Sequence, residues 1–201
     1  MKTKGIFISI IILFFLGLSY YFINLNTEED ALPRPKGYPR MNIPEHQYEL
    51  LSTKHPYQFE KSIIAVEKPD SISWAEPHWI YLYYPDWEGY IQLTYKPLNK
   101  DRQKLRDLIN DAYKLAYGHQ KKANLIEPKV MTLKNGRKAG IFELNGEIAT
   151  AFQFFITDST DHYLRGAISV KTATENDSLA PVIQYMKEDA IHLLETLEFK
   201  N

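Results

Sequence analysis

The feature that most constrains this chain is a long uncharged, apolar run close to its first residue. Residues 5–23 read GIFISIIILFFLGLSYYFI, and the next charged residue is Glu28. A helix of about 20 apolar residues is long enough to cross the hydrocarbon core of a bilayer. Because Lys2 and Lys4 precede the run and acidic residues follow it, the positive-inside rule places the rest of the chain outside the cytoplasmic membrane. The sequence therefore predicts a transmembrane signal anchor over residues 1–23.

A cleaved secretory signal is the alternative interpretation of the same run. Signal cleavage requires small residues just after the apolar stretch. Ser19 is followed there by the bulky residues Tyr20, Tyr21 and Phe22, so an uncleaved anchor is the expectation. A soluble core helix is not expected, because such a helix would show a polar face.

Charge balance and the absence of cysteine exclude several classes of function. The 24 Lys and Arg residues are matched by 25 Asp and Glu residues, for a formal net charge of −1. Nucleic acid is not expected as a partner, because the chain has no basic field to neutralise phosphates. Without Cys there is no disulfide, thiol nucleophile, Cys-ligated zinc or thiol-linked lipid. The six His residues show no metal-binding spacing such as H-E-x-x-H, so neither a metal nor a cofactor is predicted.

A proline-rich linker is predicted over residues 24–40. Pro33, Pro35 and Pro39 deny helix and central strand and favour an extended polyproline II path. The segment is either a stiff spacer or a docking strip that a partner grips, and both interpretations stay open. The side chains of the docking strip would be Arg34, Lys36, Tyr38 and Arg40.

Residues 41–201 are predicted to form one α+β domain, an antiparallel β-sheet with two amphipathic helices packed on it. One helix is expected over residues 99–117, with Asn99 or Asp101 as its cap and Gly118 in the left-handed position that ends it. The second is expected to begin near Asp177 or Ser178, with Pro181 in its first turn, and to run to Leu197. Its apolar stripe comprises Leu179, Val182, Ile183, Met186, Ala190, Leu193, Leu194 and Leu197.

The strands are predicted from alternation and from turn residues. Two hairpin turns are expected at 135–136 and 145–146, both Asn-Gly, and a third connection at 85–88. The strand at 78–84 is apolar on both faces, which predicts a central position in the sheet. The expected strands are 47–52, 58–66, 78–84, 89–95, 129–133, 138–144, 147–157 and 162–171.

The densest polar stretch, residues 153–165, reads QFFITDSTDHYLR. A hydrolase interpretation makes Ser159 or Asp158 reactive, with His162 as the base. In the structural interpretation, Asp158 and Ser159 bond the amides of a turn, and Arg165 pairs with a carboxylate across the hairpin. The structural or binding interpretation is favoured, because the members of a catalytic triad converge from separate elements. Gln153, Asp158, His162 and Arg165 are therefore predicted as an interaction surface rather than as catalytic residues.

Aromatic residues are concentrated in and around the predicted hairpin at 78–95. They line a ligand or glycan groove in one interpretation, and in the commoner one they are sheet core and cross-strand pairs. The residues concerned are Trp74, Trp79, Trp87, Tyr81, Tyr83, Tyr84, Tyr90 and Tyr95.

Several short stretches occur in one order from about Pro33 to near the end of the chain. They are PRPKGY at 33–38, GYIQLTYK at 89–96, KLAYGH at 114–119, QFFITDS at 153–159, DHYLRGA at 161–167, DSLAPV at 177–182, and His192 with ETL at 195–197. In their joint occurrence the chain resembles the gliding motility-associated lipoprotein GldD family of the Bacteroidota. The resemblance implies a non-enzymatic envelope component needed for gliding motility and the associated type IX secretion machinery, with other envelope proteins as partners. It implies no catalytic residue, cofactor or metal.

One departure from the resembled family concerns the membrane anchor. Family members usually carry a lipobox cysteine after the apolar run, and residues 19–24 contain none. Attachment is therefore expected through the helix itself, as a single-pass protein of the inner membrane with its C-terminal domain in the periplasm. The order of strands and helices, with Leu197-Glu198-Phe199 at the end, is also similar to the PsbP-like fold, which is a fold analogy only.

Overall fold

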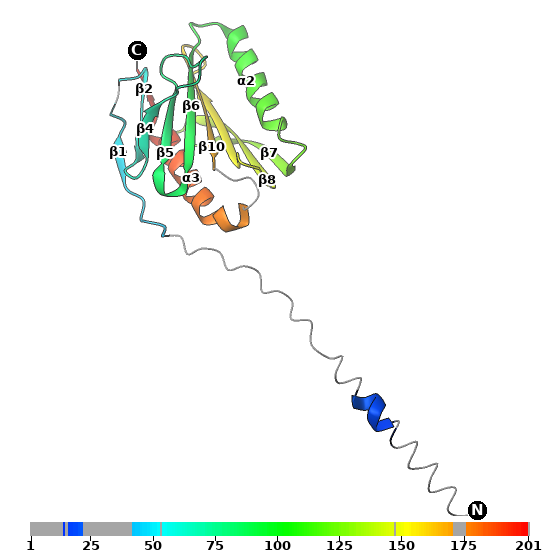
Figure 1. The fold of residues 1–201 in the computed structure, drawn as a ribbon. Coiled ribbons are helices and arrows are strands. Elements are labelled where there is room, and N and C mark those ends of the chain that lie inside the picture. The colour runs from blue at the N-terminus through cyan, green and yellow to red at the C-terminus, as the bar shows by residue number, and fades with distance from the viewer. Residues whose placement is uncertain are drawn as a thin grey trace, which may run out of the picture. The chain divides into compact units, whose positions relative to one another are not determined.

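The structure, a computed structural model, describes residues 14, 16–21, 42–52, 54–146, 148–170 and 176–200 (Figure 1). The chain divides into two units, Met1–Arg40 and Met41–Asn201. In the first unit, residue 14 and residues 16–21 are helical. Among the described residues, no helix combines the length and the apolar character that crossing a membrane requires. The predicted linker at 24–40 and most of the predicted anchor lie outside the described residues.

The second unit is built on one seven-stranded sheet in which every neighbouring pair of strands is antiparallel. Two smaller two-stranded sheets join β1 (Tyr48–Leu50) to β3 (Glu60–Ser62) and β2 (Tyr57–Gln58) to β11 (Glu198–Phe199). The predicted α+β class with an antiparallel sheet is confirmed. The order in the large sheet is β4 (Val66–Pro69), β5 (Ile80–Tyr84), β6 (Gly89–Pro97), β10 (His162–Ser169), β9 (Phe152–Thr157), β8 (Lys138–Gly146) and β7 (Ala123–Thr132).

The described residues of this unit include two α-helices, α2 (Arg102–Tyr117) and α3 (Asn176–Thr196), which pack on opposite faces of the large sheet, and a short 3-10 helix, η1 (Pro85–Trp87). Successive side chains of a strand point to opposite faces. On β8, Ile141 belongs to the core that includes α3, whereas Phe142 packs with Ala112 and Ala116 of α2. In Figure 1, α2 lies beside the β7–β8 side of the sheet and away from β4 and β5. We call these the α3 face and the α2 face.

The main hydrophobic core lies between the sheet and α3. Seven of the eight residues of the predicted stripe are buried, and the eighth, Leu179, packs against the core. Burying one such side chain contributes about 1.5–3 kcal/mol. The amphipathic pattern therefore identified the correct face of this helix. The helix begins earlier than predicted, at Asn176, so Pro181 lies in its second turn.

The structure chooses between the two predicted caps at the start of α2 and contradicts the conformation predicted at its end. Asp101 is the N-cap, and its carboxylate accepts hydrogen bonds from the backbone N–H groups of Gln103 and Lys104 at 2.8 and 3.0 Å. The left-handed conformation predicted for Gly118 is wrong, because its φ is −58°. The chain instead continues in right-handed turns, with Gly118 N–H donating to the carbonyl of Lys114 at 2.8 Å, so no positive φ is needed.

Of the two Asn-Gly hairpin turns, one is confirmed and one is wrong. Gly136 has φ +78°, and its N–H donates to the carbonyl of Leu133 at the turn between β7 and β8. Gly146 instead ends β8 and pairs with Ala123 of β7 beside an irregularity in the register. A Cβ there would lie 2.8 Å from the carbonyl oxygen of Lys122, so this glycine permits close approach of two backbones rather than a turn.

Two strand predictions also need correction. The single strand predicted at 58–66 is divided among β2, β3 and the start of β4, because a turn intervenes in which Ala65 N–H donates to the carbonyl of Ser62. The strand predicted as central at 78–84 is interior to the sheet, since β5 pairs with both β4 and β6, but it is second from the edge and only its alternate residues are buried. Tyr81 and Tyr83 are half-buried, because no described helix covers them on the α2 face. The predicted strand at 129–133 is the end of the longer β7, and the one at 147–157 begins only at Phe152.

Candidate functional site

The predicted interaction cluster at 153–165 is divided between the two faces of the sheet. His162 and Leu164 point to the α3 face, and Tyr163 and Arg165 point to the α2 face, as alternation along β10 requires. Gln153 on the neighbouring strand β9 shares the α2 face with Arg165. The four predicted residues therefore do not form one surface. The other predicted docking residues, Arg34, Lys36, Tyr38 and Arg40, lie outside the described residues.

His162 is held in the fold on several sides. It is 7% exposed, and its Nδ1 lies 2.8 Å from the hydroxyl of Tyr95. Its ring stacks on Phe199 with centroids 4.9 Å apart, and its Nε2 lies 3.9 Å from Asp158. This environment is that of a packed, hydrogen-bonded residue rather than that of a base facing a substrate.

Asp158 organises the β9–β10 turn. One carboxylate oxygen accepts the backbone N–H groups of Thr160, Asp161 and His162 at 2.9–3.0 Å. Burial alone would raise the pKa of this carboxyl, but these backbone hydrogen bonds and the nearby His162 outweigh burial and lower the pKa. Ser159 has φ +69°, and its N–H donates to the hydroxyl of Thr157. Among the described contacts Ser159 makes no hydrogen bond to His162, so the hydrolase interpretation has no geometric support.

Arg165 is the unusual member of the predicted cluster. Its guanidinium donates to the side-chain oxygen of Gln153 at 2.6 Å, and Gln153 is only 2% exposed. The predicted pairing of Arg165 with a carboxylate is wrong as far as the described residues go, because none of them forms an ion pair with it. Burial lowers the pKa of Arg165, and the neighbouring Tyr163 opposes that effect. A half-buried cation thus has an amide, not an acid, as its partner.

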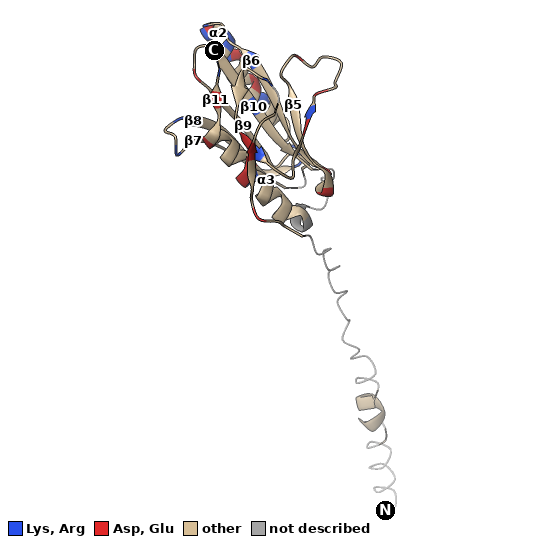
Figure 2. Ribbon diagram, turned by 90° about the vertical axis from the view of Figure 1, so that its left-hand side faces the viewer, with Lys and Arg blue, Asp and Glu red and all other residues tan. Residues whose placement is uncertain are grey.

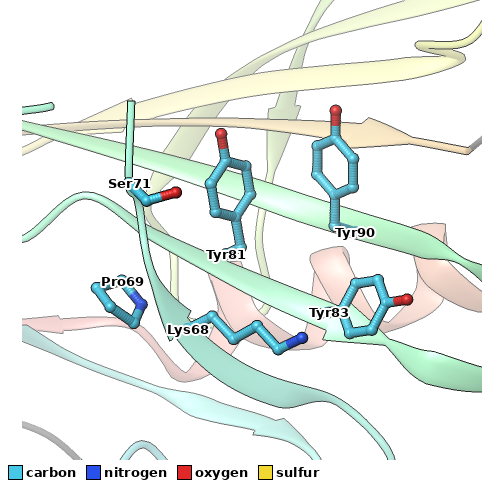
Figure 3. Close-up of a pocket in the computed structure, with 6 residues that line it drawn as sticks. All are labelled: Lys68, Pro69, Ser71, Tyr81, Tyr83 and Tyr90. Carbon is cyan, nitrogen blue, oxygen red and sulfur yellow. The ribbon is translucent and has the colours of Figure 1, made fainter. Parts of the chain in front are cut away.

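On the α2 face, no described helix covers the strands β4, β5 and β6, of which β5 and β6 carry tyrosines, and we call this region the open face. Six of its residues line a cavity of about 280 Å³, shown in Figure 3. Tyr81 and Tyr90 meet edge to face with ring centroids 5.1 Å apart, and the Lys68 ammonium lies 3.9 Å from the ring centroid of Tyr83. In Figure 3 the hydroxyls of Tyr81 and Tyr90 point the same way. The lining residues are Lys68, Pro69, Ser71, Tyr81, Tyr83 and Tyr90.

The floor of the open face is fixed by a polar side chain on β6. The amide nitrogen of Gln92 donates to Asp70 at 2.9 Å and to the hydroxyl of Tyr81 at 3.0 Å. Burial, together with the nearby Asp70, raises the pKa of Tyr81 to about 12, so its hydroxyl stays neutral at physiological pH. The region offers aromatic faces, hydroxyls and one cation, which suit recognition rather than nucleophilic chemistry.

The aromatic residues predicted as a groove are divided among the core, the open face and, for Trp74, an exposed position. Tyr84 and Tyr95 are buried in the core on the α3 face, and Trp87 stacks on Tyr84. Tyr81 and Tyr83, with Tyr90 on β6, line the cavity. Alternation within the hairpin separates the two sets, but the pattern alone does not show which set a helix covers.

A second polar cluster, which the sequence analysis missed, joins the start of the second unit to α3. His46 lies between two carboxylates, with Nε2 2.8 Å from Glu188 and Nδ1 2.8 Å from Asp189. Asp189 is 3% exposed and also accepts the hydroxyl of Tyr84 at 2.8 Å. The His46 ring stacks on Tyr185 with centroids 3.9 Å apart. We call these five residues the His46 clasp.

The clasp is extended by β1, so the first described residues of the second unit are held at several points. The Tyr48 ring stacks on His192 of α3 at 3.5 Å, and His192 pairs with Glu60 of β3 at 2.7 Å. Burial raises the pKa of Asp189, and the hydrogen bonds from Tyr84 and His46 oppose that rise. An acidic residue within the apolar stripe of α3 was the available signal for this cluster, since a buried charge requires partners.

No metal centre was found in the part of the chain that the structure describes. His55 and His78 face each other with 3.1 Å between their Nδ1 atoms, and Glu67 lies 3.4 Å from His55 Nε2. Within the described ranges, no group of three metal-ligating side chains converges. In the view of Figure 2, acidic and basic residues are interspersed over the domain rather than separated by sign.

These features define a class of protein: a small α+β domain whose polar clusters are bonded into the fold and whose aromatic open face is covered by no described helix. A protein-family model described as gliding motility lipoprotein GldD matches residues 28–199. The chain belongs to this family, which is linked to gliding motility and, as a family of lipoproteins, to the cell envelope. The resemblance inferred from the sequence is confirmed.

Among solved structures, the chain is similar to the solution structure of cyanobacterial PsbP (CyanoP) from Synechocystis sp. PCC 6803, with 10% sequence identity and a TM-score of 0.48. The similarity covers 80% of this chain and 97% of that one. No curated protein matches this chain.

Proposed function

We propose that this chain is a non-enzymatic component of the cell envelope that serves gliding motility and the associated type IX protein secretion by contacting other envelope proteins. Membership of the GldD family supports the link to motility. The lack of a catalytic arrangement at His162, Asp158 and Ser159 supports a role in binding.

The observation that carries the proposal is the open face. Tyr81, Tyr83 and Tyr90 are half-buried on paired strands of the large sheet, so their positions are rigid before any partner binds. Tyrosine is enriched at protein interfaces, because it offers a large contact area and a hydroxyl at a small cost in conformational entropy. A preformed aromatic surface beside an exposed lysine is therefore suited to a protein partner.

The proposal includes the position of the domain in the envelope. The run at 5–23 with Lys2 and Lys4 before it supports a single-pass anchor in the inner membrane, with the domain in the periplasm. Because the chain contains no cysteine, attachment does not use a thioether-linked lipid. Arg34, Lys36, Tyr38 and Arg40 are proposed as a second contact strip between the anchor and the domain.

The test is a substitution of the open face in a gliding bacterium whose only copy of this protein is the variant. Tyr83→Ala combined with Tyr90→Ala should reduce colony spreading and the recovery of cross-linked envelope partners, at unchanged abundance. Tyr117→Ala, on an exposed position of α2, is the matched control and should glide normally. Normal gliding by the double variant at normal abundance would refute the role of the open face.

The cavity favours a second candidate function, the binding of a small ligand or glycan. Its volume of about 280 Å³ and its mixture of rings and hydroxyls are compatible with one sugar ring. A titration distinguishes the two candidates. Soluble peptidoglycan fragments are added to the purified full chain in detergent, and binding is monitored by the intrinsic fluorescence of the protein. Saturable binding that Tyr83→Ala abolishes would favour the glycan candidate.

A further inference from the structure

The guanidinium of Arg165 has more hydrogen-bonding capacity than the described residues use. Arginine carries five N–H donors, and among the described residues the guanidinium of Arg165 donates one hydrogen bond, to Gln153 at 2.6 Å. No described carboxylate forms an ion pair with it, although burial already lowers its pKa. A partly desolvated cation without an opposite charge is costly, so such a group calls for an explanation.

Arg165 lies on β10, between the half of the α2 face that α2 covers and the open face. On the covered side, the hydroxyl of Tyr163 donates to the carbonyl of Leu108 in α2, and the Tyr163 ring stacks on Phe155. On the other side, Arg165 pairs in register with Thr94 of β6, a half-buried residue at the margin of the open face. Arg165 therefore stands on the strand next to the open face, half-buried and with its guanidinium bonded to Gln153 of β9.

We infer that Arg165, oriented by Gln153, is the binding site for an Asp or Glu carboxylate of the protein partner that occupies the open face. This inference rests on the proposed function and adds the chemistry of the partner. The planar guanidinium matches a carboxylate with two parallel hydrogen bonds, which a lysine does not reproduce. Aromatic neighbours reduce the local dielectric and strengthen such a pair.

The charges on the α2 face are consistent with an acid supplied from outside the domain. Lys68 supplies a positive charge at the cavity. Asp70, an acid of the open face, already accepts the amide of Gln92 and the N–H of Ile72. An acidic segment with an apolar neighbour would thus meet a cation and a tyrosine surface on the same face.

The experiment uses Arg165→Lys in the full chain, in intact membranes of the gliding bacterium. A carbodiimide joins an amine to a carboxylate only when the two are in contact, and it does not couple arginine. We expect a new amide bond between position 165 and an Asp or Glu of another envelope protein, identified by mass spectrometry of the linked peptides. The wild-type chain is the control and gives no link at this position.

Charge reversal then tests the pair itself. Arg165→Gln and Arg165→Glu should lower recovery of the partner about 10-fold to 100-fold, since a hydrogen-bonded charge pair contributes about 1.5–3 kcal/mol. Arg165→Glu combined with replacement of the identified acid by arginine should restore recovery. Unchanged abundance and circular dichroism of each variant separate loss of binding from loss of folding.

Two outcomes would overturn the inference. One is a link from position 165 to a carboxylate of the same chain, which would show that the cation is already paired internally. The other is the absence of any link from Arg165→Lys when the separate variant Tyr83→Ala, Tyr90→Ala does lose its partners. That result would overturn the inference and leave the proposed function intact. If that variant also keeps its partners, the proposed function fails as well.

Discussion

The most informative single substitution in this protein is Asp189→Ala, which removes the centre of the His46 clasp. In the folded chain the Asp189 carboxylate accepts the hydroxyl of Tyr84 and faces Nδ1 of His46, both at 2.8 Å. Tyr84 is 1% exposed, so its hydroxyl would lose its acceptor in a place that water does not reach.

The magnitude follows from these two contacts. An unsatisfied buried hydroxyl costs about 1–3 kcal/mol, and the half-exposed contact to His46 adds about 1 kcal/mol. Part of this loss is offset, because the substitution also removes the cost of desolvating the Asp189 carboxylate, the same burial that raises its pKa. We therefore expect Asp189→Ala to lower the free energy of unfolding by about 2–4 kcal/mol.

The assay is urea unfolding of the full chain in a non-ionic detergent, monitored by tryptophan fluorescence. Trp87 contributes to this signal, and its ring lies 5.0 Å from that of Tyr185 in the clasp. Asp189→Asn is the matched control, because it keeps the volume and an acceptor and should cost about 1 kcal/mol. If the alanine variant lost less than about 1 kcal/mol, or no more than the asparagine variant, the clasp would not stabilise the domain in the way described.

Two further predictions concern the large sheet. Asp158→Ala should lower the free energy of unfolding at pH 7 by about 1–2 kcal/mol. Because the folded-state pKa of Asp158 lies below its ordinary value of 3.8, its contribution is present above pH 3.8 and is lost as the pH falls through the folded pKa. The free energies of unfolding of the wild type and Asp158→Ala, measured with urea between pH 2 and 7, should therefore converge in acid. A difference that stays constant over this range would contradict the prediction. Gly166→Ala should cost about 1–3 kcal/mol, because the new Cβ would lie 2.1 Å from the buried ring of Phe154. Gly136→Ala, in open space with φ +78°, should cost about 1 kcal/mol in the same assay, and equal losses would contradict the steric argument.

Much of the candidate site was within reach of sequence reasoning. The period of two along residues 162–165 already places His162 and Arg165 on opposite faces of any strand. The same period separates Tyr81 and Tyr83 from Tyr84. Treating residues 153–165 as one cluster overlooked this alternation, and the Asx-type hydrogen bonds of Asp158 were the part of that stretch predicted correctly.

The His46 clasp was not within reach in the same way. His46 and Asp189 are separated by 143 positions, and β2 and β11 pair the beginning of the domain with its end. A pattern within a short window carries no information about which distant segment it meets. The acidic residue on the apolar stripe of α3 indicated that a partner was required, but not which one.

By itself, the sequence determined the α+β class, the apolar face of α3 and the turn at Gly136, because propensity and periodicity depend on near neighbours. Its short stretches, occurring in one order, also indicated the GldD family. The cap of α2 it left open between Asn99 and Asp101. Only the tertiary structure decided that α2 covers one half of its face of the sheet, that tyrosines remain open on the other half, and that Arg165 lies at the margin between them. Those facts depend on where a helix docks on a sheet. Docking is decided by the fit of side chains from segments far apart in the chain, and no local pattern encodes that fit.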